Sequence, residues 1–397
     1  MKKYDNYKDS GIEWIGKIPV DWVIKKLKFI AKIHNGQDQK AVLCDNGEYP
    51  VYGSGGIFGR ANSYLYDKTS VLLGRKGTID KPQYVEEPFW TVDTSYYTKI
   101  NLGYSVRYFY YLCTTINFEL YKYGSAIPSM TQGHLNEIKF ALPNSLEGQE
   151  FLANYLDHKT NQIDHLIAKK EQFIKLLEEE RVAVINQAVT KGLDPNVPMK
   201  DSGVEWLGEI PEHWKVKRLG FVFKSLNTKR IPLSGEERGQ METRIYDYYG
   251  ASGVIDKVEN FLFNEDLILI GEDGANLLTR SKRLVFIASG KYWVNNHAHI
   301  IKPISGDINY YCEFLELIDY TIYISGSAQP KLTQEALMSI KIVEPPLKEQ
   351  QDIYDFIRLQ TNNLDSIISK SKHEIELLKE YKTALISEVV TGKVDVR

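Results

Sequence analysis

The sequence predicts an α/β (α+β) fold in which two tandem globular domains are separated by two long antiparallel coiled-coil helices and related by a pseudo-twofold internal repeat. Three features predict it, and each occurs twice. They are a segment rich in tryptophan and proline, a Gly-Ser-Ala-x-Pro motif, and a stretch of some 40 residues without glycine or proline. Because 397 residues suffice for two or three domains, a duplicated unit of about 200 residues explains all three.

The clearest repeat lies at the start of each copy. Residues 9–27 read DSGIEWIGKIPVDWVIKKL and residues 201–219 read DSGVEWLGEIPEHWKVKRL, so that 11 of 19 positions are identical at an offset of 192. We therefore expect a first domain within residues 1–147 and a second within 193–347. A central helix is expected over 148–192 and a C-terminal helix over 348–397.

Each domain is expected to be a compact unit of mixed secondary structure. The apolar runs Val71–Leu73 and Leu267–Ile270 lie between glycines and predict buried strands. Residues 105–118 and 308–320 predict short helices. The matching motifs GSAIPSMTQ and GSAQPKLTQ follow at an offset of 202, so the two domains are expected to end alike.

The two long helices are predicted over residues 149–190 and 350–391, because both ranges lack glycine and proline and are rich in Leu, Ile, Glu and Lys. Their apolar residues follow a heptad-like spacing that is too narrow for burial inside a globule, so we expect the helices to pair as a coiled coil. The alternative is that each helix packs only on its own domain. The predicted core of the pair consists of Ile163, Ile167, Ile174, Leu177, Leu364, Ile368, Ile375 and Leu378.

Composition excludes several classes of protein. The chain is 43% hydrophobic and 25% charged, as is usual for a globular protein. No apolar run approaches the ~20 residues needed to span a bilayer, and no signal peptide is evident, so a cytoplasmic protein without membrane contact is expected. Three widely separated cysteines predict neither a disulfide framework nor a zinc site.

The sequence contains no convincing catalytic motif. Residues 11–17 have the GxxxxGK spacing of a phosphate-binding loop, but Ile18 stands where that loop needs Ser or Thr. Residues 53–59 resemble a dinucleotide fingerprint, with Phe58 where a glycine is required. His297 and His299 lack the further ligands of a zinc site. We therefore expect no bound cofactor, no metal and no catalytic residue in this chain, and the duplication favours a binding function.

The combined features resemble the specificity subunit of type I restriction–modification systems, and the resemblance covers the whole chain. It is carried by the twice-occurring DSGxEWxGxIPxxW segment, by GSAxPx(M/L)TQ before each long helix, and by the helical stretches TNQID (160–164) and TNNLD (361–365). Such a subunit has two target-recognition domains, each of which reads half of a bipartite double-stranded DNA sequence. The resemblance implies that the helices set the gap between the half-sites.

The resemblance also implies partners. Two methyltransferase (modification) subunits would dock on the helices, and restriction/translocase subunits would complete the complex. Adenine methylation from S-adenosylmethionine and ATP-driven cleavage would then belong to the partner subunits, which would bind S-adenosylmethionine, ATP and magnesium. Because residues 28–147 carry 12 basic and 11 acidic side chains, and residues 220–348 carry 14 and 16, we expect the chain alone to bind DNA weakly and in a salt-sensitive way.

Positions that read DNA should differ between the copies, whereas scaffold positions should match. After the first clear strand, Gly74-Arg75-Lys76-Gly77 is paired with Gly271-Glu272-Asp273-Gly274, so the glycines agree and the charges invert. Arginine can grip guanine, and carboxylates can accept from cytosine. The predicted DNA contacts of the first domain are Arg60, Arg75, Lys76, Lys81, Tyr84, Lys122, Tyr123, Ser125 and Ile127. Those of the second are Glu272, Asp273, Arg280, Lys282, Arg283, Asn295, Asn296, His297, Gln329 and Lys331.

Two alternative functions remain open from the sequence. One is a stand-alone DNA methyltransferase or nuclease, for which turnover with S-adenosylmethionine or magnesium is the test. The other is a coiled-coil adaptor that binds no DNA.

Overall fold

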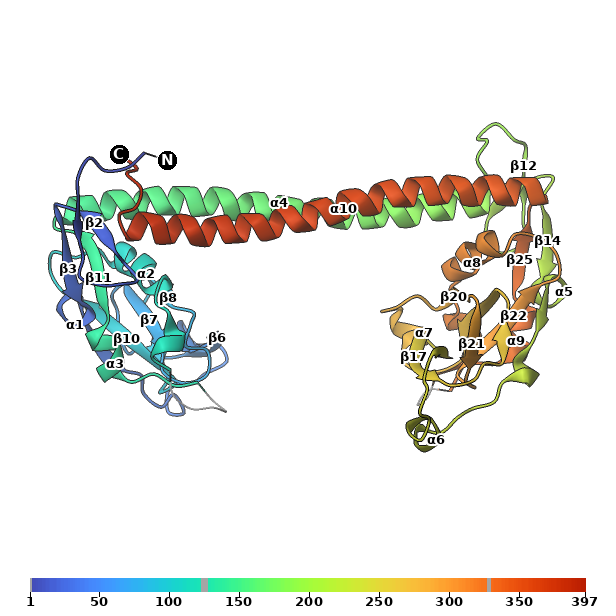
Figure 1. Cartoon of the computed structure of the whole chain (residues 1–397), viewed down its shortest axis with the longest axis horizontal. Helices are drawn as coiled ribbons and strands as arrows, with labels where there is room; N and C mark the ends of the chain where they lie inside the picture. Colours follow the sequence, from blue (N-terminus) through green and yellow to red (C-terminus); the bar gives the residue numbers. More distant parts are fainter. Residues whose placement is uncertain (1, 123–127, 327–329) are drawn as a thin grey trace. The chain divides into compact units, whose positions relative to one another are not determined.

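The computed structural model describes residues 2–122, 128–326 and 330–397 (Figure 1). The chain divides into two compact units, the first formed by residues 1–171 and 372–397 and the second by residues 172–371. Each unit contains one globular domain together with half of each long helix. We call residues 2–145 the first domain and residues 192–346 the second domain.

Each domain opens with a short hairpin made by the duplicated segment. Strand β1 (Tyr7–Asp9) pairs with β2 (Lys17–Pro19), and β12 (Met199–Asp201) pairs with β13 (Glu209–Pro211) in the same register. The second tryptophan of each copy, Trp22 or Trp214, is buried in its unit's core, and such large apolar side chains contribute strongly to stability. The repeat is therefore conserved in structure as well as in sequence.

The start and end of each domain are joined by a two-stranded sheet, which pairs β3 (Trp22–Lys26) with β11 (Lys139–Pro143), or β14 (Lys215–Arg218) with β25 (Lys341–Glu344). The central sheet of each domain has four antiparallel strands. In the first domain the order is β4 (Ala31–Asn35), β10 (Ser95–Ile100), β7 (Ser70–Gly74) and β8 (Gln83–Val85). In the second it is β15 (Phe223–Ser225), β22 (Ala298–Pro303), β19 (Leu267–Gly271) and β20 (Val285–Ala288).

Both predicted buried strands are confirmed as β7 and β19, in which all five residues are buried. Each domain also contains a second sheet. Its strands are β6 (Gly56–Ala61), β5 (Tyr49–Gly53) and β9 (Trp90–Thr91), or β17 (Gly253–Val258), β16 (Tyr246–Gly250), β21 (Lys291–Val294) and β18 (Phe263–Asn264). In both domains one pair of this sheet is parallel, β5 with β9 and β16 with β21. The same unusual pairing in both copies supports a common origin.

The predicted short helices are confirmed as α2 (Val106–Thr114) and α8 (Ile308–Leu317), which are capped by Ser105 and Asp307. Helices α3 (Gln132–Glu137) and α9 (Gln334–Ser339) are capped by Thr131 and Thr333. The remaining short elements are α1 (Leu27–Ile30), α5 (Leu219–Val222), α6 (Gly235–Gly239), α7 (Asn276–Thr279), η1 (Phe118–Leu120), η2 (Asn227–Lys229), η3 (Thr321–Tyr323), β23 (Ile324–Ser325) and β24 (Lys331–Leu332).

The long helices are α4 (Leu146–Lys191) and α10 (Leu347–Val390), which begin three residues earlier than expected. They pack together and run antiparallel. In the first unit Lys382 forms an ion pair with Asp164, and in the second unit Arg181 lies 3.2 Å from Asp365. The alternative that each helix packs only on its own domain is therefore wrong.

The residues predicted to form the core of the helix pair are shielded from solvent. Six of these residues are buried and two are partly buried, Ile167 and Leu378. The six are Ile163, Ile174, Leu177, Leu364, Ile368 and Ile375. A heptad stripe of this kind buries apolar area along the whole pair, which is how long helices gain stability that helix propensity alone does not supply.

A buried glutamine ties each domain to its long helix. Gln149 of α4 accepts a hydrogen bond from the Ser105 amide (3.1 Å) and donates to the Pro143 carbonyl (3.1 Å). Gln350 of α10 makes the matching bonds, to the Asp307 amide (2.7 Å) and the Pro345 carbonyl (2.8 Å). These bonds fix the start of each long helix to the capped end of the neighbouring short helix.

The end of each long helix is held by a lysine. Lys191, the last residue of α4, donates to the carbonyls of Leu207 and Glu209 in the second hairpin. Lys393 follows α10 and donates in the same way to Ile15 and Lys17 in the first hairpin. Within the part of the chain that the structure describes, no helix is apolar over enough of its length to cross a bilayer.

Candidate nucleic-acid interface

Three segments meet where β7 and β19 end, and they form the same backbone frame in both domains. We call residues 74–77 and 271–274 the strand-end loops. In the first domain the Arg75 amide donates to the Thr94 carbonyl (2.8 Å), the Arg75 carbonyl accepts from Met130 (2.9 Å), and Gly77 donates to Pro128 (3.0 Å). These bonds join the loop to the β9–β10 turn and to the segment before α3.

The second domain repeats each of these hydrogen bonds. The Glu272 amide donates to the His297 carbonyl (2.9 Å), the Glu272 carbonyl accepts from Leu332 (2.8 Å), and Gly274 donates to Pro330 (3.2 Å). The backbone frame is therefore independent of the side chains that it carries. This agrees with the expectation that the glycines of the loop are scaffold.

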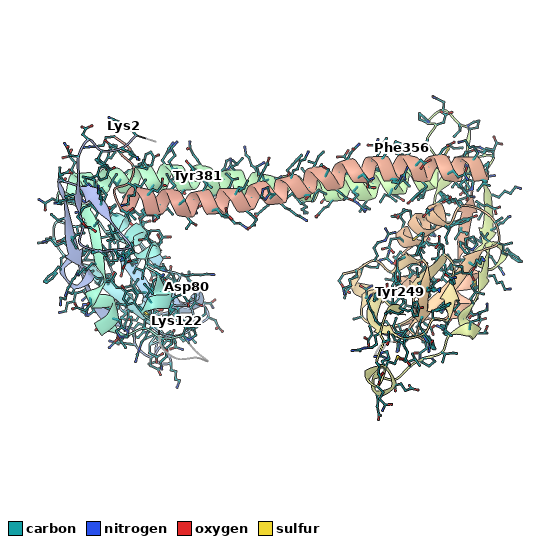
Figure 2. The ribbon with its side chains drawn as sticks, in the orientation of Figure 1. Lys2, Asp80, Lys122, Tyr249, Phe356 and Tyr381 are labelled. Carbon is teal, nitrogen blue, oxygen red and sulfur yellow. The ribbon has the colours of Figure 1, made fainter. Side chains whose placement is uncertain are left out.

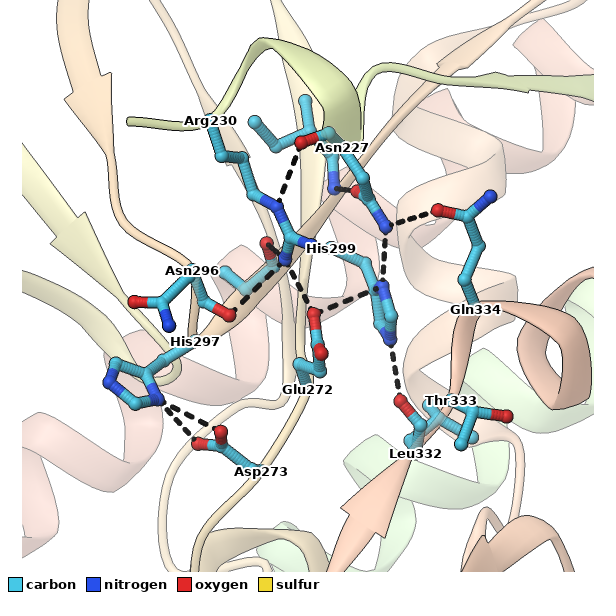
Figure 3. Close-up of polar contacts among 12 residues, drawn as sticks. Asn227, Arg230, Glu272, Asp273, Asn296, His297, His299, Leu332, Thr333 and Gln334 are labelled. Carbon is cyan, nitrogen blue, oxygen red and sulfur yellow. Dashed lines mark hydrogen bonds and ion pairs between the residues drawn. The ribbon is translucent and has the colours of Figure 1, made fainter. Parts of the chain in front are cut away.

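Two side-chain hydrogen bonds support the frame in each domain. Gln132 donates to Asn35 (2.9 Å) in the first domain, and Asn227 donates to Gln334 (2.8 Å) in the second. The second hydrogen bond is different in the two domains. The Tyr96 hydroxyl donates to the Met130 carbonyl (3.1 Å), whereas in the second domain a histidine ring occupies the equivalent position (Figure 3).

That ring belongs to His299, which is buried. Its Nε2 lies 2.7 Å from the Leu332 carbonyl and its Nδ1 lies 2.8 Å from the Asn227 amide nitrogen. Because a carbonyl only accepts, Nε2 carries the proton and Nδ1 accepts from Asn227. Burial lowers the pKa of His299 below its usual value, so the ring is neutral at pH 7 and acts as a fixed strut.

In the strand-end loop of the second domain, the Glu272 carboxylate is paired with cations of the same domain. Glu272 is only 7% exposed, and its carboxylate pairs with Arg230, lies 3.1 Å from the Lys331 amine, and lies 3.5 Å from His299. Burial alone would raise the pKa of Glu272, but the cations Arg230 and Lys331 outweigh it and hold that pKa below its usual range. Arg230 also donates to the carbonyls of Asn296 and Ala298.

The neighbouring residues of this loop are closer to solvent. Asp273 lies 2.9 Å from Nδ1 of His297, whose ring is half-exposed. Asn295 is buried, and its side-chain oxygen accepts from the His297 amide (2.8 Å). Asp273, His297 and the exposed Asn296 therefore form the accessible edge of the loop, while Asn295 orients the turn that carries them.

The strand-end loop of the first domain is different in charge. Arg75 is half-buried and donates through Nη1 to the Asp93 carbonyl (3.2 Å), which leaves its charge without a carboxylate partner. Lys76 and Lys81 are exposed. Among the residues that the structure describes, none of these three cations forms an ion pair. A cation without an internal counterion is available to an external anion such as phosphate.

Other predicted contacts of the first domain lie elsewhere and have internal partners. Arg60 on β6 donates to the carbonyls of Gly47 and Glu48. The Tyr84 ring on β8 packs under the Arg107 guanidinium at 4.3 Å, and Lys122 pairs with Glu119. Tyr123, Ser125, Ile127 and Gln329 lie outside the described residues.

The basic cluster of the second domain packs mainly against helix α8. Arg283 lies 3.0 Å from Glu313, and Arg280 donates to the Glu316 carbonyl and stacks over Tyr320. Arg280 is the one non-glycine residue with positive φ (50°) among those described, because it ends α7 in a left-handed turn. Lys282 is exposed. These contacts favour a structural role for the two arginines over a contact with DNA.

Sequence reasoning missed several residues that the structure brings to this interface. Arg230, Asn35 and Asn227 come from other elements, and only the fold places them beside the loops. A further missed feature is a pair of exposed apolar residues on β6 and on β17, Ile57–Phe58 and Val254–Ile255. The signal was present, because these pairs occur at an offset of 197, the same offset that relates the strand-end loops.

Comparison with known proteins identifies the family to which these features belong. A family model described as type I restriction modification DNA specificity domain matches twice, over residues 19–176 and 211–377. The chain is 20% identical to the type I restriction enzyme EcoDI specificity subunit of Escherichia coli, with 95% of this chain and 90% of that protein covered. It is 24% identical to the MjaIX specificity subunit of Methanocaldococcus jannaschii, with 96% and 95% covered.

The fold also has a solved counterpart. A chain from a structural study of complex assembly and conformational transition in the type I restriction–modification system matches with a TM-score of 0.73 at 12% identity. The match covers 95% of this chain and 99% of that one. At this identity the likeness establishes the shared fold.

Proposed function

The chain belongs to the family of type I restriction modification DNA specificity domains, and we propose that its two domains each read one half of a bipartite duplex target through their strand-end loops. It is a specificity subunit with two target-recognition domains, and its role is to give the complex its DNA sequence specificity. It acts together with the other subunits of a restriction–modification complex.

The observation that carries the assignment of the reading site is the shared frame with inverted charge. Hydrogen bonds of the same pattern hold Arg75–Lys76 in one domain and Glu272–Asp273 in the other. Because the backbone hydrogen bonds are the same around either charge, the frame itself does not require a particular side chain at these positions. Such positions are suited to distinguish bases, because the groove edges of the four base pairs differ in donors and acceptors.

In the first domain we assign DNA contact to Arg75, Lys76 and Lys81, whose charges have no internal carboxylate partner among the described residues. In the second domain we assign it to Asp273, Asn296 and His297 at the accessible edge. Glu272 is assigned a supporting role there, because a buried carboxylate that is paired with two cations cannot reach a base without losing both.

The long helices are assigned two roles. Because they form a continuous antiparallel pair, they can fix the gap between the half-sites, as the spacing of paired recognition elements does in other DNA readers. Large apolar side chains on the faces not used for pairing, such as Phe356 and Tyr381 (Figure 2), support docking of methyltransferase subunits, since exposed apolar patches mark protein interaction sites. We place S-adenosylmethionine, ATP and magnesium on partner subunits, and we propose that this chain itself is not catalytic.

Mapping of methylated adenines tests this proposal. A host that expresses the chain with its methyltransferase partner should show methylation at a target with two short defined blocks and an undefined gap. Expression of the Arg75→Ala variant should alter one block and leave the other unchanged. A single continuous target, or methylation by this chain without a methyltransferase subunit, would contradict the proposal.

A further inference from the structure

Both domains carry a tight hairpin whose tip exposes two adjacent apolar side chains. The β5–β6 hairpin turns at Ser54–Gly55, and the β16–β17 hairpin turns at Ala251–Ser252. Just after the turn, Ile57 and Phe58 are 56% and 54% exposed, and the matching Val254 and Ile255 are 49% and 56% exposed. We call Ile57–Phe58 and Val254–Ile255 the apolar tips.

A β-bulge explains why both members of each tip face solvent. In a regular strand adjacent side chains point to opposite faces, but the register shifts between Val51 and Tyr52, and likewise between Tyr248 and Tyr249. Phe58 and Ile255 are therefore the extra residues of the bulge. A β-bulge changes the direction in which a side chain points, and it is a specific structural feature and not a defect of the strand.

A glycine of the preceding strand lies beside each bulged side chain. A Cβ on Gly53 would lie 3.4 Å from the Phe58 ring, and a Cβ on Gly250 would lie 3.2 Å from Ile255. The turn itself needs Gly56 and Gly253, whose φ angles are 122° and 113°. The same apolar projection is thus built twice, by the same backbone device.

The turn that precedes each tip lies against the strand-end loop of its domain. In the first domain Gln83 donates to the Gly53 carbonyl (2.9 Å), and a Cβ on Gly77 would lie 3.3 Å from the Ser54 hydroxyl. In the second, a Cβ on Gly271 would lie 2.8 Å from the Ala251 carbonyl. The hairpin therefore leans directly on the loop that we assign to DNA contact.

Resting on the proposed function, we propose that each apolar tip is a wedge that enters a base step of its half-site and unstacks it. The assigned reading positions differ between the domains, as Lys76 and Asp273 do, whereas the tips keep apolar character in both. Because the exposed apolar pair is present in both domains although their reading positions differ, we infer that it performs a task that does not depend on the DNA sequence. Apolar wedges that part base steps and kink the duplex are a known solution to that task.

The wedge has a consequence for the partner enzyme. An enzyme that modifies a base inside a duplex must first extrude it from the stack, at a cost of a few kcal/mol. A tip that has already parted a neighbouring step would lower that cost. In this account the specificity subunit both selects the target and prepares it for chemistry.

The test uses the full chain in complex with its methyltransferase subunits and a duplex that carries the mapped target. The fluorescent base 2-aminopurine is placed in turn at each step of each half-site, because its emission rises when it is unstacked. The variants are Phe58→Ser and Ile255→Ser. Matched controls are Leu102→Ser and Ile304→Ser, which alter residues 101% and 66% exposed at the far end of β10 and β22 from the strand-end loops.

The wild-type complex should show raised emission in both half-sites. Phe58→Ser should abolish it in the half-site of the first domain alone and weaken binding about tenfold, which corresponds to about 1.4 kcal/mol. Ile255→Ser should do the same for the other half-site, and the controls should behave as wild type. A mismatch at the affected step should restore the affinity of the variant, because a mismatched base costs less to unstack.

Three results would overturn the wedge while leaving the proposed function intact. The first is that the tip variants bind and emit as the controls do. The second is that replacing thymine by uracil weakens wild-type binding as much as the variants do, which would make the tips readers of thymine methyl groups. The third is that the variants fail to assemble with the methyltransferase in gel filtration, which would make the tips a protein contact. If instead the wild-type complex showed no sequence-selective binding, the proposed function itself would be contradicted.

Discussion

The two strand-end loops have the same pattern of backbone hydrogen bonds, but the side chains at their two central positions have different roles. In the first domain Arg75 and Lys76 add charge to the surface, whereas in the second domain Glu272 turns inward and binds Arg230 and Lys331. The contrast shows that equivalent positions in a duplicated fold need not have equivalent roles. One copy can use a charge to hold the loop together while the other uses it to contact a ligand.

The largest expected difference is in stability. Arg230→Met removes the main partner of the buried Glu272 carboxylate, so it should lower the stability of the second unit by about 2–4 kcal/mol. Arg75→Met at the loop of the first domain should change stability by less than about 0.5 kcal/mol, as surface substitutions usually do. Hydrogen exchange read by mass spectrometry would report each unit separately. If the two substitutions lowered the stability of their units equally, the claimed difference between the two loops would be contradicted.

The next difference concerns base selectivity. Arg75→Ala should relax one position of a single half-site by about 1–3 kcal/mol if the guanidinium grips a base. It should weaken all sequences alike if the guanidinium contacts phosphate. Competition binding with a set of single-base variants of the target separates these outcomes, and an unchanged profile would exclude Arg75 from the interface.

The dependence of binding on salt sharpens the comparison further. Lys76→Ala should reduce the slope of log affinity against log salt by about 1, because a free lysine that meets phosphate releases a counterion. Lys331→Ala should leave the slope unchanged, since that amine already lies 3.1 Å from Glu272. Titrations between low and physiological salt measure both slopes. A reduced slope for Lys331→Ala would mean that its amine leaves Glu272 when DNA binds.

The smallest expected effect is the dependence of the second unit's stability on pH through His299. Burial lowers the pKa of His299 in the folded protein, so below the ordinary histidine value the unfolded chain binds a proton that the folded chain resists. The stability of the second unit should therefore fall as the pH drops below about 6.5. His299→Tyr, which imports the first domain's residue at this position, should flatten that fall. An equally steep fall in the variant would assign it to another group.

Most of the fold could be predicted from the sequence, because the repeated segments show where each domain begins and ends. Repeated tryptophans, apolar runs between glycines and a heptad stripe predicted the domains, the strands β7 and β19 and the core of the helix pair. The register and the parallel pairing of β16 with β21 could not be predicted, because they depend on contacts between residues that lie 45 positions apart in the sequence.

The site was less accessible to sequence reasoning. The inverted charges located the strand-end loops, but charge alone did not reveal that Glu272 is buried, since its partner Arg230 lies 42 residues earlier. The clustered arginines near residue 280 looked like a DNA-binding patch, and the fold instead gives Arg280 and Arg283 partners on α8. The apolar tips escaped notice because isolated exposed apolar residues are ordinary, and only their recurrence on matched bulges distinguishes them.

The most direct test of the account shortens the paired helices. Four residues would be deleted from α4 and four from the facing part of α10, which removes about 6 Å from the pair, and the methylated adenines of the host would then be mapped. The account predicts the same two half-sites with a shorter gap between them. The same half-sites at the original gap would contradict the claim that the helices set the distance between two independent readers.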